Sequence, residues 1–268
     1  MLRSYWEVRV MIIRKTCPNL SLYWDKCAFI LYPEKEKEYE KGKKLDQEIL
    51  KGMKAQENQL KECLDLLEQR RKAVVEEMKE AIVFDFTMKL KGRLLVGSGN
   101  PSALEVGMTF SRNYGVPIIP GSALKGAFSN YIKEEPEKVK INEDLKFIFG
   151  QGDPTKEDDN TRGAIVFLDA IPQEAVSFEL DIVNNHFQPY YMEESNPPND
   201  WYNPVPVAYL VVSNTAFRFT ALYNSMMTLP KDKFIKLRKS IEESFVDMLT
   251  LYGVGAKTNY GYGRFVKH

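Results

Sequence analysis

The chain has 268 residues, of which 44% are hydrophobic and 28% charged, as is typical of a soluble globular protein with a sizeable core. Its 37 basic and 37 acidic residues balance, so no overall charge attracts nucleic acid, and an anion site must come from local separation of charge. Three cysteines without metal-ligand spacing argue against a disulfide framework and a zinc site, and they fit a reducing cytoplasm. The N-terminus lacks an apolar core of signal-peptide length, and no apolar run approaches the roughly 18 residues of a membrane span.

Two segments precede the main part of the chain. Residues 1–33 are predicted to form a strand or extended arm that packs on the body, because apolar side chains alternate over residues 5–13 and continue at Leu20, Leu22 and Trp24. Residues 34–81 are rich in Lys and Glu, with apolar positions at alternating steps of three and four, which predicts a long helix or helical hairpin. The apolar seam of this helical insertion needs a partner, either the body of this protein or a neighbouring subunit.

Residues 82–268 carry the pattern of one α+β body. The predicted elements are a strand at 82–96, a helix at 121–133, a buried strand ending at Pro172, a strand at 178–182, a hairpin at 205–212 and 217–223, a helix at 231–252 and a last strand at 263–267. An acidic segment at 150–162 is expected to be mobile. The resulting β-α-β-β-α-β order predicts a ferredoxin-like or RRM-like fold with insertions.

The C-terminal residues 253–268 read G-V-G-A-K-T-N-Y-G-Y-G-R-F-V-K-H. Four glycines allow positive φ and close approach of a ligand, and no acid interrupts the donors Lys257, Thr258, Asn259 and Arg264. We call residues 253–264 the glycine loop. It lacks the spacing of a Walker A motif. The pattern suits a loop that holds an anionic backbone, and it suits equally well a plain turn into a last edge strand.

The helix at 121–133 begins with P-G-S-A-L-K, in which Ser122 is a suitable N-cap. Lys125 would then stand in the first turn, where the helix dipole disfavours a cation. A bound anion would offset this mismatch, although a lysine that simply reaches outward explains it equally well. We expect this helix start to lie beside the glycine loop and to hold the same ligand.

Between Phe86 and Lys133 the only acid is Glu105, against six Lys and Arg residues that include Arg112, so one face of the body is expected to be basic. Residues 184–203 are polar and rich in proline yet carry five aromatic side chains. Such a loop is typically functional, which predicts that it projects from the body and brings aromatic side chains to nucleic acid or to a neighbouring subunit. The alternative is a local cluster of these aromatics.

Only His186 and His268 are present, and no arrangement of a catalytic triad or a metal site is visible. His186 is a candidate general base in a ribonuclease, but the absence of a second acid or base nearby except Asp181 favours a structural or RNA-stacking role. No cofactor or metal is predicted.

Three motifs together resemble the RAMP superfamily of CRISPR effector subunits, in particular the backbone subunits of the type III-B (Cmr) complex. They are the glycine loop, the P-G-S-A-L-K-G-A helix start, and the block L-D-I-V-N-N-H-F-Q-P-Y-Y followed by P-N-D-W. The block departs from the family's more typical N-P-H-Y at Asn185 and Phe187.

The resemblance implies a cytoplasmic ribonucleoprotein subunit. Its partners would be guide (CRISPR) RNA, held near the 3′ end without sequence preference, target RNA, and other subunits of the complex, while the projecting loop would disturb the guide–target duplex. The residues predicted to contact RNA are Arg112, Ser122, Lys125, His186, Gly255, Lys257, Thr258, Asn259, Tyr260 and Arg264.

The resemblance also bears on catalysis, because target cleavage in this family belongs to a different backbone subunit, which has a carboxylate in the loop after the first strand. That loop offers only Glu105 here, so the chain is predicted not to be an enzyme. Two alternatives remain open. One is an endoribonuclease that processes precursor guide RNA through His186, and the other is an assembly cap that uses the helices at 34–81 without touching RNA.

Overall fold

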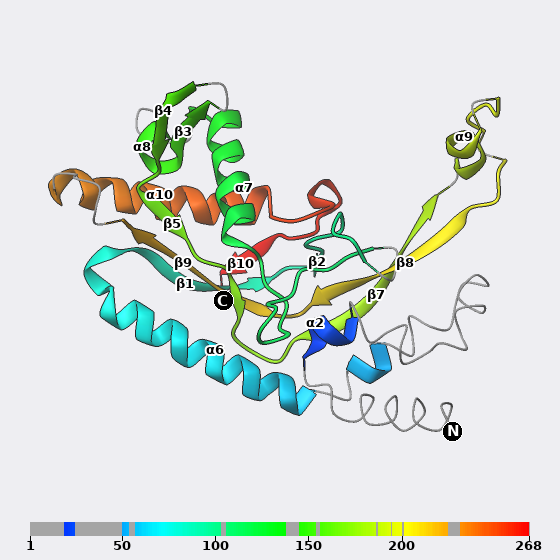
Figure 1. Cartoon of the computed structure of the whole chain (residues 1–268), viewed down its shortest axis with the longest axis horizontal. Coiled ribbons are helices and arrows are strands. Elements are labelled where there is room, and N and C mark those ends of the chain that lie inside the picture. The colour runs from blue at the N-terminus through cyan, green and yellow to red at the C-terminus, as the bar shows by residue number, and fades with distance from the viewer. Residues whose placement is uncertain are drawn as a thin grey trace.

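The computed structural model describes residues 19–24, 50–53, 57–102, 106–137, 145–153, 156–185, 187–193, 195–199, 201–224 and 231–267. Within these ranges the chain forms a body of helices around a sheet, and a two-stranded ribbon extends from one end of the body (Figure 1). No helix among the described residues is both long and apolar enough to cross a membrane. The arm expected at 5–13 lies outside the described residues, and the divisions of the chain near residues 33 and 81 stay predictions.

The body is built on a five-stranded antiparallel sheet. Its strands are β1 (Ile82–Leu90), β5 (Ile165–Phe167), β6 (Ile171–Pro172), β9 (Ala216–Tyr223) and β10 (Phe265–Lys267). The main order is β10-β1-β9-β5, with β6 also paired to β9. The two crossover helices are α7 (Gly121–Glu134) and α10 (Lys231–Leu251). This chain order and strand order are those expected of the predicted β-α-β-β-α-β unit.

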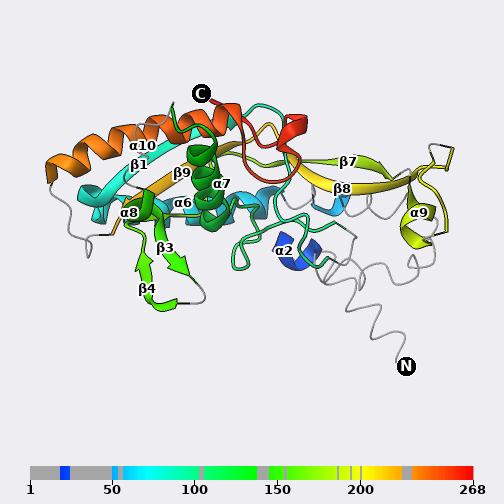
Figure 2. The same ribbon diagram turned by 90° about the horizontal axis from the view of Figure 1, so that it is seen from above.

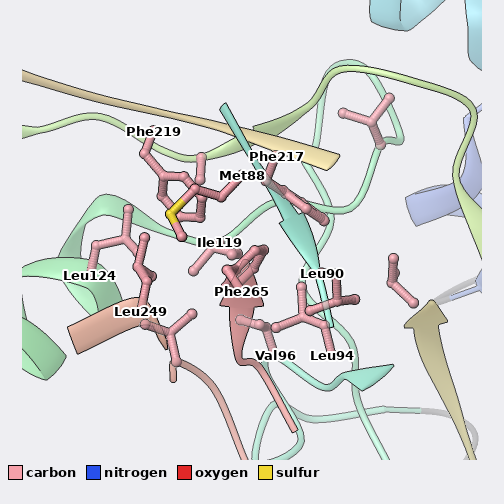
Figure 3. Packing of buried hydrophobic residues seen from close by; sticks show 14 of the residues in the cluster. Met88, Leu90, Leu94, Val96, Ile119, Leu124, Phe217, Phe219, Leu249 and Phe265 are labelled. Carbon is pink, nitrogen blue, oxygen red and sulfur yellow. The ribbon is translucent and has the colours of Figure 1, made fainter. Parts of the chain in front are cut away.

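The core lies between the sheet and these two helices. Phe245 of α10 stands at its centre, with its ring centroid 4.6 Å from that of Phe84 and 5.2 Å from that of Phe128. At the other end of the core, Met88, Phe219 and other apolar side chains surround Phe265 (Figure 3). Because burying each large apolar side chain contributes about 1.5–3 kcal/mol, this cluster fixes how α7 and α10 sit on the sheet.

The opposite face of the sheet is covered by α6 (Glu57–Glu77), which leads through a 3₁₀ turn, η3 (Lys79–Ala81), into β1. Leu60 and Leu64 of α6 are buried in the common core, and Arg71 donates hydrogen bonds to Thr220 Oγ1 (3.1 Å) and to the carbonyl of Asp169 (2.9 Å). The seam of the predicted helical insertion therefore has its partner in the body of this protein.

The ribbon consists of β7 (Ser177–Asn185) and β8 (Val205–Ser213), which pair along their whole length, with the short β2 (Arg93–Leu94) beside β8 at its root. A short helix, α9 (Gln188–Met192), lies at its far end (Figures 1 and 2). The predicted projection is confirmed. The predicted hairpin after it is wrong, because β8 and β9 pair in different sheets. Asn214, at φ +41°, stands at the bend between them.

Three further expectations differ from the structure. The strand predicted over 82–96 ends at Leu90, and the chain turns before β2 joins the second sheet. Leu20–Leu22 form a short helix, α2, capped by the side chain of Asn19, rather than a strand. The segment at 150–162, where no strand was expected, forms a hairpin of β3 (Gly150–Asp153) and β4 (Lys156–Arg162) that follows helix α8 (Leu145–Phe149), and its expected mobility stays a prediction.

Candidate nucleic-acid interface

The glycine loop is held by backbone hydrogen bonds to residues 91–95, which comprise the turn after β1, the short strand β2 and the residue that follows it. Ala256 N–H donates to Leu95 O (2.8 Å), Gly263 N–H donates to Arg93 O (2.7 Å), and Lys91 N–H donates to Arg264 O (2.9 Å). A 3₁₀ turn, η5 (Thr258–Tyr260), lies at the tip of the loop. The loop is therefore a fixed part of the body.

The glycines serve this packing in different ways. Gly255 has φ +93°, and a Cβ there would lie 2.4 Å from Leu95 O, so glycine is required by contacts within the chain. Gly261 has φ +87°, but a Cβ there would meet no atom within 4 Å. Space for a ligand to approach the backbone therefore exists at Gly261, whereas Gly255 is explained by the fold itself.

The loop and the middle of α7 frame a pocket of about 410 Å³. Its polar lining includes Asn130, Thr258, Asn259 and Arg264, and its apolar lining includes Ala127, Leu251 and Val254. Amide, hydroxyl and guanidinium groups thus converge on a space of the size that small-molecule sites occupy.

Arg264 supplies the positive charge of this pocket. Its side chain is half-buried, and the buried Nε has no hydrogen-bond partner among the described residues. A guanidinium in a pocket wall can donate charge-assisted hydrogen bonds to an anionic or carbonyl group, and these are stronger than bonds between neutral groups. Because the glycine loop has no Asp or Glu, none of its own side chains competes for that donor.

The predicted helix start does not join this pocket. The N-cap of α7 is Pro120, and Gly121 N–H donates to Asp169 Oδ1 at 2.8 Å. The prediction of Ser122 as N-cap is therefore wrong, and the carboxylate of Asp169 occupies the position where we expected a bound anion. Ser122 is exposed and Lys125 half-buried, and neither lines the pocket. The structure brings the second and third turns of α7 to the loop instead of the first.

Lys257 points away from the pocket toward the ribbon. With φ +61°, it donates from Nζ to Tyr209 Oη (2.8 Å), and Nζ lies 4.3 Å from the centre of the Tyr209 ring. Thr258 and Asn259 do line the pocket, while Tyr260 is 85% exposed. The Arg112 side chain is exposed on a separate loop, and His186 lies outside the described residues.

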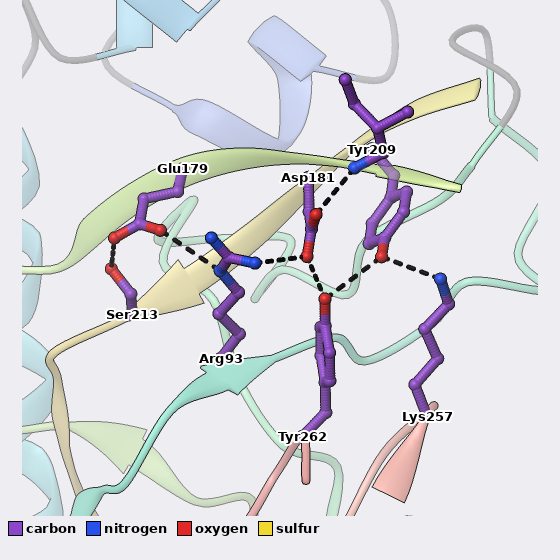
Figure 4. A network of polar contacts seen from close by, with 8 residues as sticks. Arg93, Glu179, Asp181, Tyr209, Ser213, Lys257 and Tyr262 are labelled. Carbon is purple, nitrogen blue, oxygen red and sulfur yellow. Dashed lines mark hydrogen bonds and ion pairs between the residues drawn. The ribbon is translucent and has the colours of Figure 1, made fainter. Parts of the chain in front are cut away.

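Lys257 belongs to a polar network that joins the glycine loop to the root of the ribbon (Figure 4). Tyr262 donates to Asp181, so Tyr209 is the donor in the 3.2 Å bond between the two tyrosine hydroxyls. Arg93 Nη1 lies 2.7 Å from Asp181 Oδ2, and its Nε lies 3.4 Å from Glu179 Oε2. Side chains from β2, β7, β8 and the glycine loop thus meet at one point.

The network also shifts two pKa values. Burial raises the pKa of Asp181, but hydrogen bonds from Tyr262 and the Ile182 N–H, together with Arg93, outweigh it and hold this pKa below its usual range. Burial and the hydrogen bond to Asp181 raise the pKa of Tyr262 well above its usual range. Asp181 is therefore an ionised carboxylate already bonded to donors, which makes it a poor general base.

Comparison with known proteins identifies the family. The model of the RAMP superfamily matches residues 87–266, which include the glycine loop, α7, the ribbon and the whole of the sheet except the start of β1 and the last residue of β10. The chain belongs to the RAMP superfamily.

Among the described residues, no three His, Cys, Asp or Glu side chains come together as they would in a metal site.

Two RAMP relatives and one solved structure set the context. The chain is 28% identical to the CRISPR system Cmr subunit Cmr6 of Pyrococcus furiosus, over 95% of this chain and 96% of the relative. It is 25% identical to the corresponding subunit of Saccharolobus solfataricus, over 81% and 67%. A chain of the type III-B Cmr-beta complex bound to cognate target RNA, solved by cryo-electron microscopy, shares the fold with a TM-score of 0.56 at 23% identity, over 75% of this chain and 64% of that one.

Sequence reasoning missed two parts of this RAMP site. One part is Asn130, which lies three residues after Ala127 and therefore on the same face of the helix. A small side chain next to an amide on one face could have indicated that this face borders a pocket. The network of Arg93, Tyr209 and Tyr262 had no local signal, because its members come from elements far apart in the sequence.

Proposed function

We propose that this chain is a non-catalytic backbone subunit of a type III-B CRISPR (Cmr) ribonucleoprotein effector, in the position of the Cmr6 relatives. In that role it binds guide RNA near its 3′ end and helps to present the guide for pairing with target RNA in antiviral defence. Two findings support this role. The similarity to Cmr6 extends over nearly the whole of both chains, and the family model includes all parts of the pocket.

The observation that carries the RNA-binding part is the pocket between α7 and the glycine loop. The half-buried guanidinium of Arg264 lines this pocket together with the amides of Asn130 and Asn259. A guanidinium binds phosphate strongly, and amide side chains can bond either sugar or base edges. Because these groups select no sequence by themselves, we expect affinity for many RNA sequences, with a strong dependence on salt.

The proposal that the subunit does not cut RNA rests on the state of its carboxylates. Asp181, the acid nearest His186 in sequence among those of the ribbon, accepts hydrogen bonds from Tyr262 and Arg93, and Asp169 caps α7. Each of these carboxylates is already bonded to a structural partner, whereas a catalytic base must be free to accept a proton from a water molecule or a hydroxyl group. In the loop after β1, the only acid in the sequence is Glu105, which lies outside the described residues.

The RNA-binding part is tested by reconstituting the effector from defined subunits and guide RNA, with Arg264→Ala in this chain. We expect guide RNA affinity to fall about tenfold, since a charge-assisted hydrogen bond is lost. Lys239→Ala is the matched control, because Lys239 is an exposed cation on α10 that does not line the pocket. Equal affinities of the two variants would contradict the proposal.

Incubating the purified chain and the reconstituted complex with precursor repeat RNA separates the proposal from the endoribonuclease alternative. We expect intact RNA after incubation with the chain alone. Cleavage that His186→Ala abolishes would establish the enzyme instead. Crosslinking of the assembled complex tests the other alternative. If this chain assembles with the other subunits but forms no crosslink to RNA, it is an assembly cap.

A further inference from the structure

The far end of the ribbon exposes large apolar side chains. Tyr191 is 70% exposed, Met192 75% and Trp201 89%. They lie in and after α9, at the end of the ribbon away from the body (Figures 1 and 2). Some aromatics of the tip do pack locally, since the Tyr190 and Tyr191 rings are 5.4 Å apart, and Tyr202 Oη donates to the Pro197 carbonyl at 3.1 Å. The expected local cluster is therefore only partial, and a gathering of exposed apolar groups marks an interaction site.

The segment that forms the ribbon and its tip contains acids but no Lys or Arg. Residues 177–213 contain five acids, Glu179, Asp181, Glu193, Glu194 and Asp200, and no Lys or Arg. The cations that contact the ribbon come from other elements, and both Arg93 and Lys257 bind at its root. At the tip, Glu193 is exposed next to Met192. The tip thus carries an exposed negative charge beside its exposed apolar side chains.

This combination does not suit RNA. Proteins that stack bases on aromatic side chains pair those side chains with a positive groove that follows the phosphates, and the ribbon provides only negative charge. Tyr, Trp and Met are, by contrast, the side chains enriched at the centre of protein interfaces, and acids fit the rim of an interface whose partner is basic. Charge complementarity therefore favours a basic protein surface over nucleic acid.

From these observations we propose that the ribbon tip is a protein-docking element, which inserts Tyr191, Met192 and Trp201 into an apolar groove rimmed by Lys and Arg on a neighbouring subunit. This inference rests on the proposed function, because it needs the chain to act within a multi-subunit complex. It departs from the expectation, implied by the family resemblance, that the projecting loop acts on the guide–target duplex.

The root of the ribbon supports this role. Nine paired residues on each strand give the ribbon a length of about 30 Å, at about 3.3 Å per residue, and the four pairs beyond Asp181 and Tyr209 carry the tip away from the body. A two-stranded ribbon alone is marginally stable in water, but the ion pairs of Arg93 with Glu179 and Asp181 and the hydroxyl of Tyr262 fasten its root to the body. A tip held in place before docking loses less entropy when it binds.

Photocrosslinking decides between protein and RNA. The Trp201→p-benzoylphenylalanine variant is assembled with the other purified subunits and guide RNA, with and without target RNA, and irradiated. A crosslink to one protein subunit is expected. A crosslink to guide or target RNA, to a second copy of this chain, or to nothing in the assembled complex would overturn the inference while leaving the proposed function intact. Failure of the wild-type chain to assemble would instead contradict the proposed function.

A charge reversal at the tip gives results of opposite sign for the two classes of partner. Glu193→Lys should reduce incorporation into the complex about fivefold if the partner's rim is basic, and it should increase retention of RNA if the tip meets phosphates. Asp65→Lys, an exposed acid on α6, is the matched control and should have no effect. Trp201→Ala should reduce incorporation at least about tenfold, as expected for a central aromatic anchor. Normal incorporation of both tip variants would overturn the inference.

Discussion

The glycine loop and the ribbon lie side by side but carry opposite charge. The glycine loop, residues 253–264, contains Lys257 and Arg264 without any acid, while the ribbon residues 177–213 contain five acids without any Lys or Arg. Where the two regions meet, Lys257 donates a hydrogen bond to Tyr209 of the ribbon, whereas Arg264 lines the pocket. The number of cations in a segment therefore overstates the charge available to a ligand, because tertiary contacts divide those cations between binding and structure.

The largest effect is expected where the positive region depends on its backbone. Gly255→Ala places a Cβ 2.4 Å from Leu95 O and should lower the free energy of unfolding by about 3–4 kcal/mol, because strain at positive φ is added to a clash with backbone. Gly261→Ala has the same strain with open space and should cost about 1–2 kcal/mol. Urea denaturation of the two variants measures the difference, and equal losses would contradict the packing role of Gly255.

The same isosteric substitution, Asn to Asp, made once in each region tests whether the two regions differ in their response to negative charge. Asn259→Asp places a carboxylate in the pocket and should reduce guide RNA affinity roughly tenfold at about 0.1 M salt, because it repels phosphate and competes for Arg264. Asn184→Asp makes the same change at an exposed position of β7 and should leave affinity unchanged. Binding titrations at two salt concentrations check both. A similar loss from Asn184→Asp would show that RNA also follows the ribbon.

The junction of the two regions should respond to pH. Because the pKa of Asp181 is lower in the folded chain than its usual value, its ionised form stabilises the fold above the unfolded pKa of about 3.9, and this contribution is lost as pH falls through the folded pKa. Asp181→Asn should therefore cost about 1 kcal/mol at pH 7, with the difference from wild type shrinking below about pH 4.

Chemical denaturation of wild type and variant between pH 7 and pH 3 measures this effect. In a Tyr262→Phe background, which lacks the hydroxyl donor, the cost of Asp181→Asn should be smaller. A cost that stays constant over the whole pH range would show that ionised Asp181 does not hold the junction.

The smallest effect is expected at Lys257. Lys257→Met keeps the stem that covers Tyr209 and removes the charge, so guide RNA affinity should fall only about twofold, since this ammonium already binds the ribbon. The comparison is with Arg264→Ala in the same titration. An equal loss from both variants would place Lys257 among the phosphate-binding groups and remove the distinction between the two cations of the loop.

Much of the fold follows from local pattern. The spacing of Leu124, Phe128, Tyr131 and Ile132 predicts α7, the stripe ending at Met248 and Tyr252 predicts α10, and all of these side chains are buried or half-buried in the structure. Such predictions succeed because an amphipathic helix must turn its apolar face inward whatever it packs against. The same is true of Gly253, whose φ of +81° ends α10 as the sequence predicted.

The candidate site depended on contacts between distant parts of the chain. The sequence marked Thr258, Asn259 and Arg264, which do line the pocket, but it paired them with Ser122 and Lys125 in place of Ala127 and Asn130. Which turn of α7 meets the loop depends on how both helices pack around Phe245, and no residue of α7 alone encodes that register.

By itself the sequence determined the order of strands and helices in the β-α-β-β-α-β unit, the acid-free glycine loop and the cation-free ribbon, since each is a property of consecutive residues. Only the tertiary structure decided that β8 and β9 enter different sheets, that Asp169 caps α7, and that Lys257 serves the ribbon while Arg264 serves the pocket. The physical reason is that a hydrogen bond or ion pair forms with whichever partner the packed core brings within about 3 Å, and that partner can lie anywhere in the chain.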